Sequence, residues 1–380
     1  MDTSLFKLLI VDSEDWTFWF HRLSLALTVK ATGAEVKLLT RCNDYAERIK
    51  EKGINIANVD FVRSSKLPFN DLANILKLRR TFKQYKPDII HNVALKTILI
   101  SSIAALGIKN VSVVNAFTGL GYVFSSQQFQ ARFIRFFIKP VFKYFAQRPN
   151  YWTIFQNPDD MQLFIEQGLA VSERSILIRG SGVDTSEFIQ SPDDNETPVV
   201  MLASRMLWDK GIGEFVDAAK RARLAGLKAK FVLVGDVDPD NPMSIPETTL
   251  KMWSDEGYIE WQGHNSDMPK KLAMASIVCL PSYREGLPKV LLEAAAVGRP
   301  LIATDVPGCR EIVKNNENGL LVELKNVDSL YNAIQQLVSN KDLREEMGRN
   351  SRSLVEAELS TDIINAQTIR FYKSLCNECP

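Results

Sequence analysis

The segment that decides the fold is Pro281-Ser-Tyr-Arg-Glu-Gly-Leu-Pro-Lys-Val-Leu-Leu-Glu293. The apolar run before it, residues 275–280, predicts a short buried strand, and Pro288 suits the first position of a helix, where its missing N–H costs nothing. The helix start offers free N–H groups and a partial positive charge, which suit a diphosphate. Glu285 in the loop and Glu293 in the helix can each accept hydrogen bonds from hydroxyls, one set on a sugar and one on a ribose. The segment therefore indicates a nucleotide-sugar site. The alternative is an exposed loop glutamate and a solvated helical one.

The spacing of these two glutamates, with Ala294-Ala-Ala-Val-Gly-Arg-Pro300 after them, resembles the E-x7-E motif of retaining glycosyltransferases of family 4. This resemblance implies the GT-B fold, an α/β architecture of two Rossmann-like domains that face each other across a cleft. It implies an N-terminal acceptor domain over residues 1–190 and a C-terminal nucleotide-sugar domain over 191–360. A last helix over 361–380 is expected to return to the first domain.

Apolar strand-like runs alternate with amphipathic helical stretches along both halves of the chain, which predicts parallel sheets covered by helices on both faces. The expected strands are residues 7–11, 35–39, 88–91, 111–115, 152–155, 176–178, 199–203, 230–234, 258–261, 277–280 and 301–304. The expected helices include residues 18–30, 70–85, 97–106, 328–339, 342–358 and 361–376. The polar stretch 191–198 is expected to be a linker.

The bulk composition is that of a globular protein with two domains. The chain has 380 residues, of which 46% are hydrophobic and 24% charged. Five scattered cysteines, with one isolated C-x-x-C pair at Cys376 and Cys379, argue against a disulfide framework. The N-terminal apolar run is too short for a signal peptide, and no stretch is long and apolar enough to span a membrane. We therefore expect a cytoplasmic protein.

Charge is unevenly distributed along the chain. Residues 1–150 contain 22 Lys and Arg against 11 Asp and Glu, whereas the remainder contains 24 against 34. No acidic residue lies between Asp88 and Asp159. A basic first half predicts an anionic partner, such as a membrane surface, a phosphorylated acceptor or a nucleic acid. No nucleic-acid-binding motif accompanies it, so nucleic acid is not expected.

Further residues could bind the donor. Arg205 and Lys210 follow the strand 199–203, and the resemblance implies that this pair neutralises the leaving diphosphate. It also places Arg284, Gly286, Leu287 and Pro288 beside Glu293 at the donor. Asp236 and Asp238 form a D-x-D pattern, which alone does not make a metal site, and the family needs no metal. We therefore expect neither a metal nor another cofactor.

Several residues of the first half could bind the acceptor. The loop from Asp12 occupies the place of the family's first glycine-rich loop, but it lacks the double glycine and retains His21 and Arg22. His91 lies two positions before the histidine that many relatives carry near the sugar, and it could be either a catalytic or a structural residue. The remaining candidates are Lys96 and the glycine-aromatic loop with Thr118, Gly119 and Tyr122, which resembles a subgroup that extends lipid-diphosphate-linked saccharides.

Residues 129–145 predict an unusual helix. Arg132, Arg135, Lys139 and Lys143 form one stripe on a helical wheel, bordered by phenylalanines. A cationic face of this kind suits an anionic membrane surface. The alternative is a core helix with a solvated basic edge.

Taken together, the residues and the resemblance predict a retaining, metal-independent glycosyltransferase. It would move a hexose or N-acetylhexosamine from a nucleotide donor, expected to be UDP-linked, to a lipid-linked or otherwise anionic saccharide. The membrane would hold it peripherally. The rival functions are a GT-B nucleotide-sugar epimerase or hydrolase, an anionic-polymer-binding protein without catalysis, and an inactive scaffold subunit.

Overall fold

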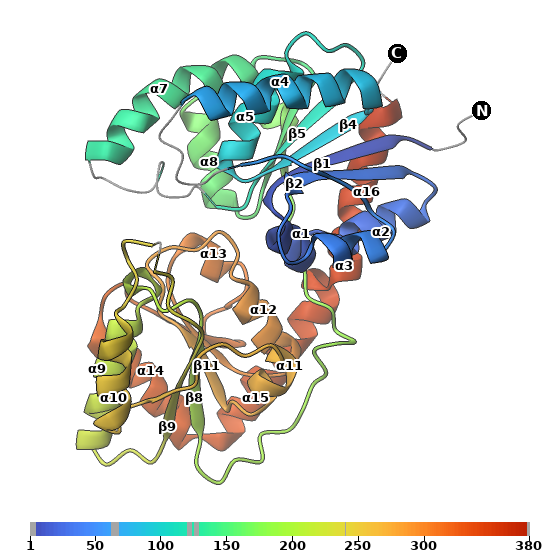
Figure 1. Ribbon diagram of the computed structural model, residues 1–380. Helices are drawn as coiled ribbons and strands as arrows, with labels where there is room; N and C mark the ends of the chain where they lie inside the picture. Colours follow the sequence, from blue (N-terminus) through green and yellow to red (C-terminus); the bar gives the residue numbers. More distant parts are fainter. Residues whose placement is uncertain (1–4, 62–67, 120–123, 125–128, 240, 378–380) are drawn as a thin grey trace. The chain divides into compact units, whose positions relative to one another are not determined.

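The computed structural model describes residues 5–61, 68–119, 124, 129–239 and 241–377 (Figure 1). The chain forms two compact units. The first comprises Met1–Ser181 together with Ile364–Pro380, and the second comprises Gly182–Ile363. Each unit contains one parallel β-sheet, as the alternating pattern predicts.

The first unit is built on a seven-stranded sheet of order β3-β2-β1-β4-β5-β6-β7. Its strands are β1 (Lys7–Glu14), β2 (Glu35–Arg41), β3 (Asn55–Asn58), β4 (Ile89–Val93), β5 (Ser112–Phe117), β6 (Tyr151–Phe155) and β7 (Ser175–Leu177). Its helices are α1 (Asp15–His21), α2 (Leu23–Ala31), α3 (Ala46–Glu51), α4 (Pro68–Tyr85), α5 (Leu95–Ala105), α7 (Phe129–Ala146), α8 (Pro158–Glu166), the 3₁₀ turn η1 (Ser172–Arg174) and α16 (Thr361–Asn377).

Both faces of this sheet are buried. Leu8 and Ile10 of β1 pack with α1, α2 and α16, whereas their neighbours Leu9 and Val11 pack with α4 and α5. This alternation explains why β1 is a continuous apolar run, because successive side chains point to opposite faces and each face has a helical layer. Figure 1 shows α16 beside α2, although the two helices lie at opposite ends of the sequence.

The second unit has a six-stranded sheet of order β10-β9-β8-β11-β12-β13. Its strands are β8 (Val199–Ala203), β9 (Lys230–Val234), β10 (Glu260–Trp261), β11 (Ile277–Leu280), β12 (Leu301–Thr304) and β13 (Gly319–Val322). Its helices are η2 (Trp208–Lys210), α9 (Ile212–Leu224), α10 (Glu247–Asp255), α11 (Met268–Ala273), α12 (Lys289–Ala296), α13 (Pro307–Arg310), α14 (Val327–Ser339), α15 (Lys341–Leu354) and the π-helix η3 (Val355–Leu359).

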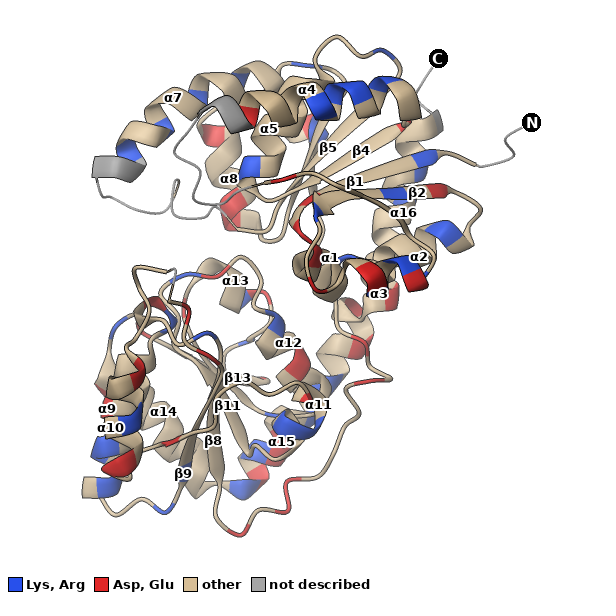
Figure 2. Ribbon diagram, in the orientation of Figure 1, with Lys and Arg blue, Asp and Glu red and all other residues tan. Residues whose placement is uncertain are grey.

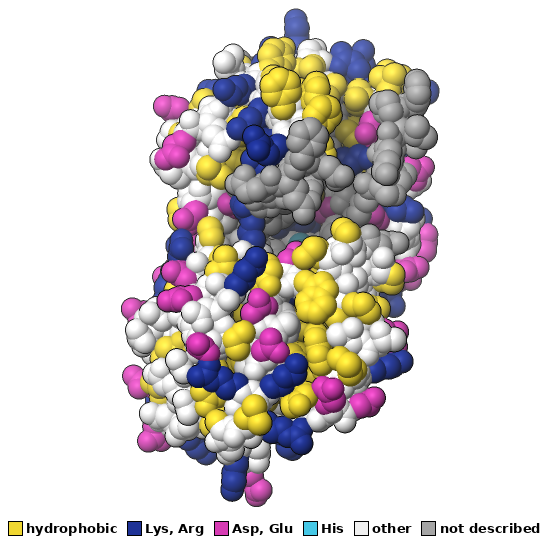
Figure 3. Space-filling view, turned by 90° about the vertical axis from the view of Figure 1, so that its left-hand side faces the viewer, with side chains coloured by type: hydrophobic (Ala, Val, Ile, Leu, Met, Phe, Trp, Pro, Cys, Tyr) yellow, Lys and Arg dark blue, Asp and Glu magenta, His cyan; other side chains and the backbone are white. Residues whose placement is uncertain are grey.

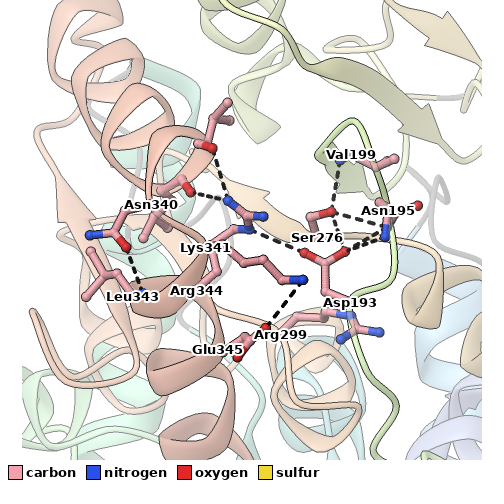
Figure 4. A network of polar contacts seen from close by, with 12 residues as sticks. Asp193, Asn195, Val199, Ser276, Arg299, Asn340, Lys341, Leu343, Arg344 and Glu345 are labelled. Atoms are coloured by element: carbon pink, nitrogen blue, oxygen red, sulfur yellow. Dashed lines mark hydrogen bonds and ion pairs between the residues drawn. The ribbon is translucent and has the colours of Figure 1, made fainter.

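The expected linker at 191–198 lies within the second unit and is held there by polar contacts (Figure 4). Asp193 accepts hydrogen bonds from Ser276 at 2.8 Å and Asn195 at 2.9 Å, and it pairs with buried Arg344 at 3.3 Å. Arg299, only 2% exposed, donates to the carbonyl oxygens of Ser191 and of other residues. The segment is irregular in backbone but fixed in place.

Most expected elements are present, with three corrections. The helix expected over 18–30 is two helices, α1 and α2, because the backbone breaks at Arg22, whose φ is −133°. Pro288 precedes the first residue of α12 rather than occupying it. The strands β3 and β13 were not expected.

Candidate active site

The carboxyl edge of the second sheet brings together the loops that follow β8 and β11. In this sheet β9 pairs with one edge of β8 and β11 pairs with its other edge, so the strand order switches direction between β8 and β11. Ligands of open parallel sheets bind at such a switch in strand order. The two loops touch, because a Cβ on Gly211 would lie 2.1 Å from the carbonyl oxygen of Pro281. Gly211 also has a φ of 72°, a left-handed conformation that favours glycine.

Lys210 and Glu285 form an ion pair at this switch point. The Lys210 Nζ donates to the Glu285 Oε1 at 2.6 Å, and both side chains are largely buried, with 21% and 12% exposed. The two residues are 75 positions apart in sequence. The pair orients the carboxylate and leaves further N–H donors of the ammonium for another anion.

Glu293 lies in α12, the helix that follows the Glu285 loop, and is 8% exposed. Its carboxylate is 3.4 Å from the Lys289 ammonium. Desolvation raises the pKa of Glu293 above its ordinary value, although Lys289 opposes the shift. A buried carboxylate with a raised pKa beside the loops of this switch point is a candidate for a functional group.

The loop that carries Glu285 is braced by the end of β12. Thr304 donates through its hydroxyl to the carbonyl oxygen of Ser282. A Cβ on Gly308 in α13 would lie 2.4 Å from the Gly286 carbonyl oxygen, so α13 lies directly against this loop. Arg284, Gly286 and Leu287 are half-buried, and Pro288 is buried. Sequence reasoning missed Thr304 and Gly308, although the first ends a predicted strand and the second lies four residues after it, in the same strand-loop-helix pattern.

Arg205 is differently placed. Its guanidinium donates to the Asp238 carboxylate at 2.7 Å, and its side chain is 56% exposed. The Asp236 carboxylate lies 3.8 Å from the His264 ring. The D-x-D acids are therefore engaged by basic side chains. Within the described residues, no group of three or more His, Cys, Asp and Glu side chains is arranged to hold a metal ion.

The first unit has its own switch in strand order, between β1 and β4. His91 in β4 is 2% exposed, and its Nδ1 lies 2.9 Å from the hydroxyl of Tyr372 in α16. Burial, together with the nearby Arg22 charge, lowers the pKa of His91 to about 3, so the ring is neutral at physiological pH. Arg22 and His21 line the same pocket as His91. The structure thus brings together the two predicted acceptor residues His21 and Arg22 with the catalytic candidate His91.

Asp12 in β1, next to β4 in the sheet, is also buried. Its Oδ1 accepts from the Thr17 hydroxyl at 2.6 Å and the Ser13 N–H at 2.7 Å. Desolvation raises its pKa to about 6, opposed by those bonds and by the Arg22 charge. Sequence reasoning did not select Asp12 or Tyr372.

The other predicted acceptor residues among those described are not lining residues of the pocket that contains His91. Lys96 in α5 pairs with Asp71 in α4 at 3.1 Å. Thr118 is exposed and Gly119 is half-buried after β5. Tyr122 lies outside the described residues.

The basic stripe of α7 lies beside an exposed apolar surface. Arg132 and Lys143 are exposed, whereas Arg135 and Lys139 are half-buried. The exposed apolar side chains of the same helix are Phe133, Ile134, Phe136 and Phe137, between 41% and 73% exposed. Ile134 and Phe137 therefore do not cover the core, while Phe142 and Phe145 do. Figure 2 shows α7 with basic positions and no acidic ones, and Figure 3 shows hydrophobic and basic side chains intermixed on this side.

Two family models match the chain. Residues 7–149 match the model described as glycosyl transferase 4-like, and residues 184–354 match the model described as glycosyl transferases group 1. The chain is a family 4 glycosyltransferase. The family and the enzyme class predicted from the two-glutamate motif are confirmed.

Named relatives of this glycosyltransferase act on lipid-linked sugars. It is 27% identical to the N,N'-diacetylbacillosaminyl-diphospho-undecaprenol alpha-1,3-N-acetylgalactosaminyltransferase of Campylobacter jejuni, over 88% of this chain and 90% of the relative. It is also 27% identical to the UDP-Gal:alpha-D-GlcNAc-diphosphoundecaprenol alpha-1,3-galactosyltransferase of Escherichia coli, over 75% of each chain.

Solved glycosyltransferase structures share its fold. A glycosyltransferase of Rickettsia africae superposes with a TM-score of 0.80 at 18% identity, over 98% of this chain and 99% of the other. Anabaena HepE, solved with UDP and glucose, superposes with a TM-score of 0.78 at 19% identity, over 97% and 100%. These likenesses confirm the expected GT-B fold class. No helix among the described residues is long and apolar enough to cross a membrane.

Proposed function

We propose that this glycosyltransferase moves a hexose or N-acetylhexosamine from a UDP-sugar to a saccharide carried on a lipid diphosphate, as a step in surface polysaccharide synthesis. The observation that carries the proposal is the Lys210–Glu285 pair at the switch point of the second sheet, with buried Glu293 in the following helix. The names of the Campylobacter and Escherichia relatives support a lipid-diphosphate acceptor.

On the donor side, each role follows from charge and burial. Lys210 stabilises the negative charge that develops on the leaving diphosphate, an electrostatic role for a cation held in a largely water-excluded site. Glu285, oriented by Lys210, accepts hydrogen bonds from donor-sugar hydroxyls. Glu293 accepts them from the ribose. Arg205 adds positive charge once the diphosphate competes with Asp238 for its guanidinium. No metal is needed in this scheme.

On the acceptor side, the chain is proposed to work as a peripheral protein at the cytoplasmic face of a membrane. The support is α7, where the four basic residues Arg132, Arg135, Lys139 and Lys143 accompany exposed phenylalanines. Attraction to anionic lipid is worth about 1 kcal/mol for each Lys or Arg near the surface. Phenylalanines at the same surface add apolar burial in the interfacial region. This arrangement brings the first unit to a lipid-linked substrate.

The proposal is tested by incubating the purified protein with single UDP-sugars and a short-chain prenyl-diphosphate saccharide, and identifying the products by mass spectrometry. We expect the acceptor mass to increase by one hexose or N-acetylhexosamine for at least one donor. Glu285→Gln, expected to lose roughly tenfold to a hundredfold in transfer rate, serves as the low-activity control. Glu346→Gln, an exposed glutamate of α15, serves as the matched fully active control. Release of free sugar or an epimerised donor without an extended acceptor would instead support the hydrolase or epimerase alternative.

A further inference from the structure

The loop that carries Glu285 and the loop that carries Lys210 are joined by more than their ion pair. The Tyr283 N–H donates to the Asp209 carbonyl oxygen at 2.9 Å. Asp209 directly precedes Lys210, and Tyr283 lies two residues before Glu285. The bond therefore links the backbones of the same two loops that the 2.6 Å ion pair links through side chains.

The Tyr283 side chain adds a second link, to the helix that follows Lys210. Its hydroxyl donates to the Glu214 Oε1 at 2.7 Å, and Glu214 lies in the first turn of α9. Burial, the bond to Glu214 and nearby negative charge raise the pKa of Tyr283, so the hydroxyl keeps its proton and is the donor. The Lys325 Nζ, from the loop after β13, lies 4.5 Å from the ring centroid. The ring is thus held both through its hydroxyl and over its face.

The same loop is also anchored on its other side. The Thr304 hydroxyl, at the end of β12, donates to the Ser282 carbonyl oxygen. Consecutive residues therefore tie the backbone toward β12 and toward α9, directly before Glu285. Tyr283 supplies the anchor on the side of Lys210.

The ion pair alone would not keep Glu285 in place during the reaction. Lys210 is proposed to stabilise the leaving diphosphate, and its ammonium has three N–H donors to share between that anion and Glu285. A diphosphate attracts the ammonium and so weakens its hold on the carboxylate. The two Tyr283 hydrogen bonds do not depend on the Lys210 charge. They keep the loop preorganised, which matters because a small misplacement of a binding group is costly in rate.

We propose that Tyr283 is a positioning residue. Through Asp209 and Glu214 it holds the Glu285 loop against the Lys210 loop, so that Glu285 stays at the donor sugar while Lys210 serves the diphosphate. The inference rests on the proposed function, which assigns Glu285 to the sugar. The link between Tyr283 and Glu214 does not, and it is measured separately.

The link is measured by thermal unfolding of Tyr283→Phe, Glu214→Met and the double variant. Tyr283→Phe keeps the ring and removes only the hydroxyl. We expect each single variant to lower Tm by a few degrees, and the second change to cost little once the first is made, because both remove the same hydrogen bond. Additive shifts would overturn the link. Tyr258→Phe is the matched control: it is a half-buried tyrosine of the same unit, with Lys220 and Arg223 over its ring, and its shift should add to that of Glu214→Met.

Kinetics test whether Tyr283 acts through Glu285. Tyr283→Phe should lower kcat/KM for the donor about tenfold and leave the acceptor KM within twofold. In a Glu285→Ala background the same change should alter kcat/KM less than twofold, because the side chain to be positioned is absent. Glu214→Gln, which keeps an oxygen acceptor, should retain more transfer than Glu214→Met. An unchanged kcat/KM in Tyr283→Phe, equal losses in the two backgrounds, or equal losses in the two Glu214 variants contradict a positioning role.

Binding tests the same inference without an acceptor. By calorimetry with UDP, UDP-glucose and UDP-N-acetylglucosamine, Tyr283→Phe should weaken binding of the better-bound UDP-sugar about tenfold and binding of UDP less than twofold, since Glu285 is assigned to the sugar. Equal weakening of UDP and UDP-sugar, or weakening of neither, overturns the proposal. If the wild type transfers to no acceptor, the proposed function fails, while the Tm and binding results still decide the role of Tyr283.

Discussion

Replacing Glu293 by glutamine should stabilise the free protein and at the same time remove most of its activity. Desolvation raises the pKa of this carboxyl above its ordinary 4.5, against the opposing charge of Lys289. The folded state therefore holds the proton more tightly than the unfolded state. It follows that the free energy of unfolding decreases as pH rises from about 4.5 through the raised pKa of the folded state. Above that pKa, the full cost of the buried negative charge is present.

The size of each effect can be bounded. Losing the partly exposed pair with Lys289 costs at most about 1 kcal/mol, and relief of carboxylate desolvation outweighs it because the pKa is raised. Losing one charge-assisted hydrogen bond to the ribose costs about 1.5–3 kcal/mol, which is roughly tenfold to a hundredfold in kcat/KM. The variant should thus have a higher free energy of unfolding and a much lower kcat/KM.

Urea denaturation of ligand-free protein at several pH values, with transfer assays at pH 7, measures both quantities. The stability advantage of Glu293→Gln over wild type should be present at pH 7 and shrink toward pH 4.5. Glu346→Gln, exposed on α15, should show neither change. A variant less stable than wild type at pH 7 would show that the Lys289 pair outweighs desolvation, and near-wild-type kinetics would remove Glu293 from the donor site.

Three further outcomes are expected. Glu285→Gln should keep the fold and lose roughly tenfold to a hundredfold in transfer rate, since a charge-assisted bond to the donor is lost; unchanged kinetics would place the donor sugar elsewhere. Transfer should survive EDTA, because Lys210 and Arg205 supply the positive charge at the diphosphate; loss of turnover that magnesium or manganese restores would contradict this and return attention to Asp236 and Asp238. Replacing the four basic residues of α7 by glutamine should release the protein from anionic vesicles, as added salt should, without unfolding it, and should lower transfer to a soluble acceptor analogue much less than transfer to the lipid-linked one; vesicle binding equal to wild type would favour the solvated-edge interpretation.

The sheet strands that carry the donor site were predictable because they are buried on both faces. Strands β8, β9, β11 and β12 have the bounds expected from their apolar runs. The missed strands lie at sheet edges, where burial leaves a weaker signal. β3 is the mixed stretch Asn55–Asn58, and β13 begins with a glycine.

The features of the candidate site also fall into those that the sequence predicts and those that it does not. Glu285 and Lys210 were predictable because each follows an apolar strand and opens a helix, a pattern read within a few residues. The helix break at Arg22 was not predictable. Apolar residues are spread around the α1–α2 segment, so its sequence has no helical periodicity that a break would interrupt. The pairing of His91 with Tyr372 leaves no local trace, because it depends on how α16 packs in the first unit.

The place of α16 has a consequence for how the chain is made. Ile364, Phe371 and Tyr372 complete the first unit's core, yet they leave the ribosome only after the whole second unit has been synthesised. At elongation rates of about 5–20 residues per second, those intervening residues take on the order of ten to thirty seconds. During that interval the nascent first unit holds an uncovered apolar strip and an imidazole without its phenol partner. The first unit, begun first, is therefore finished last, and it is the part of the nascent chain in which a chaperone would find exposed core.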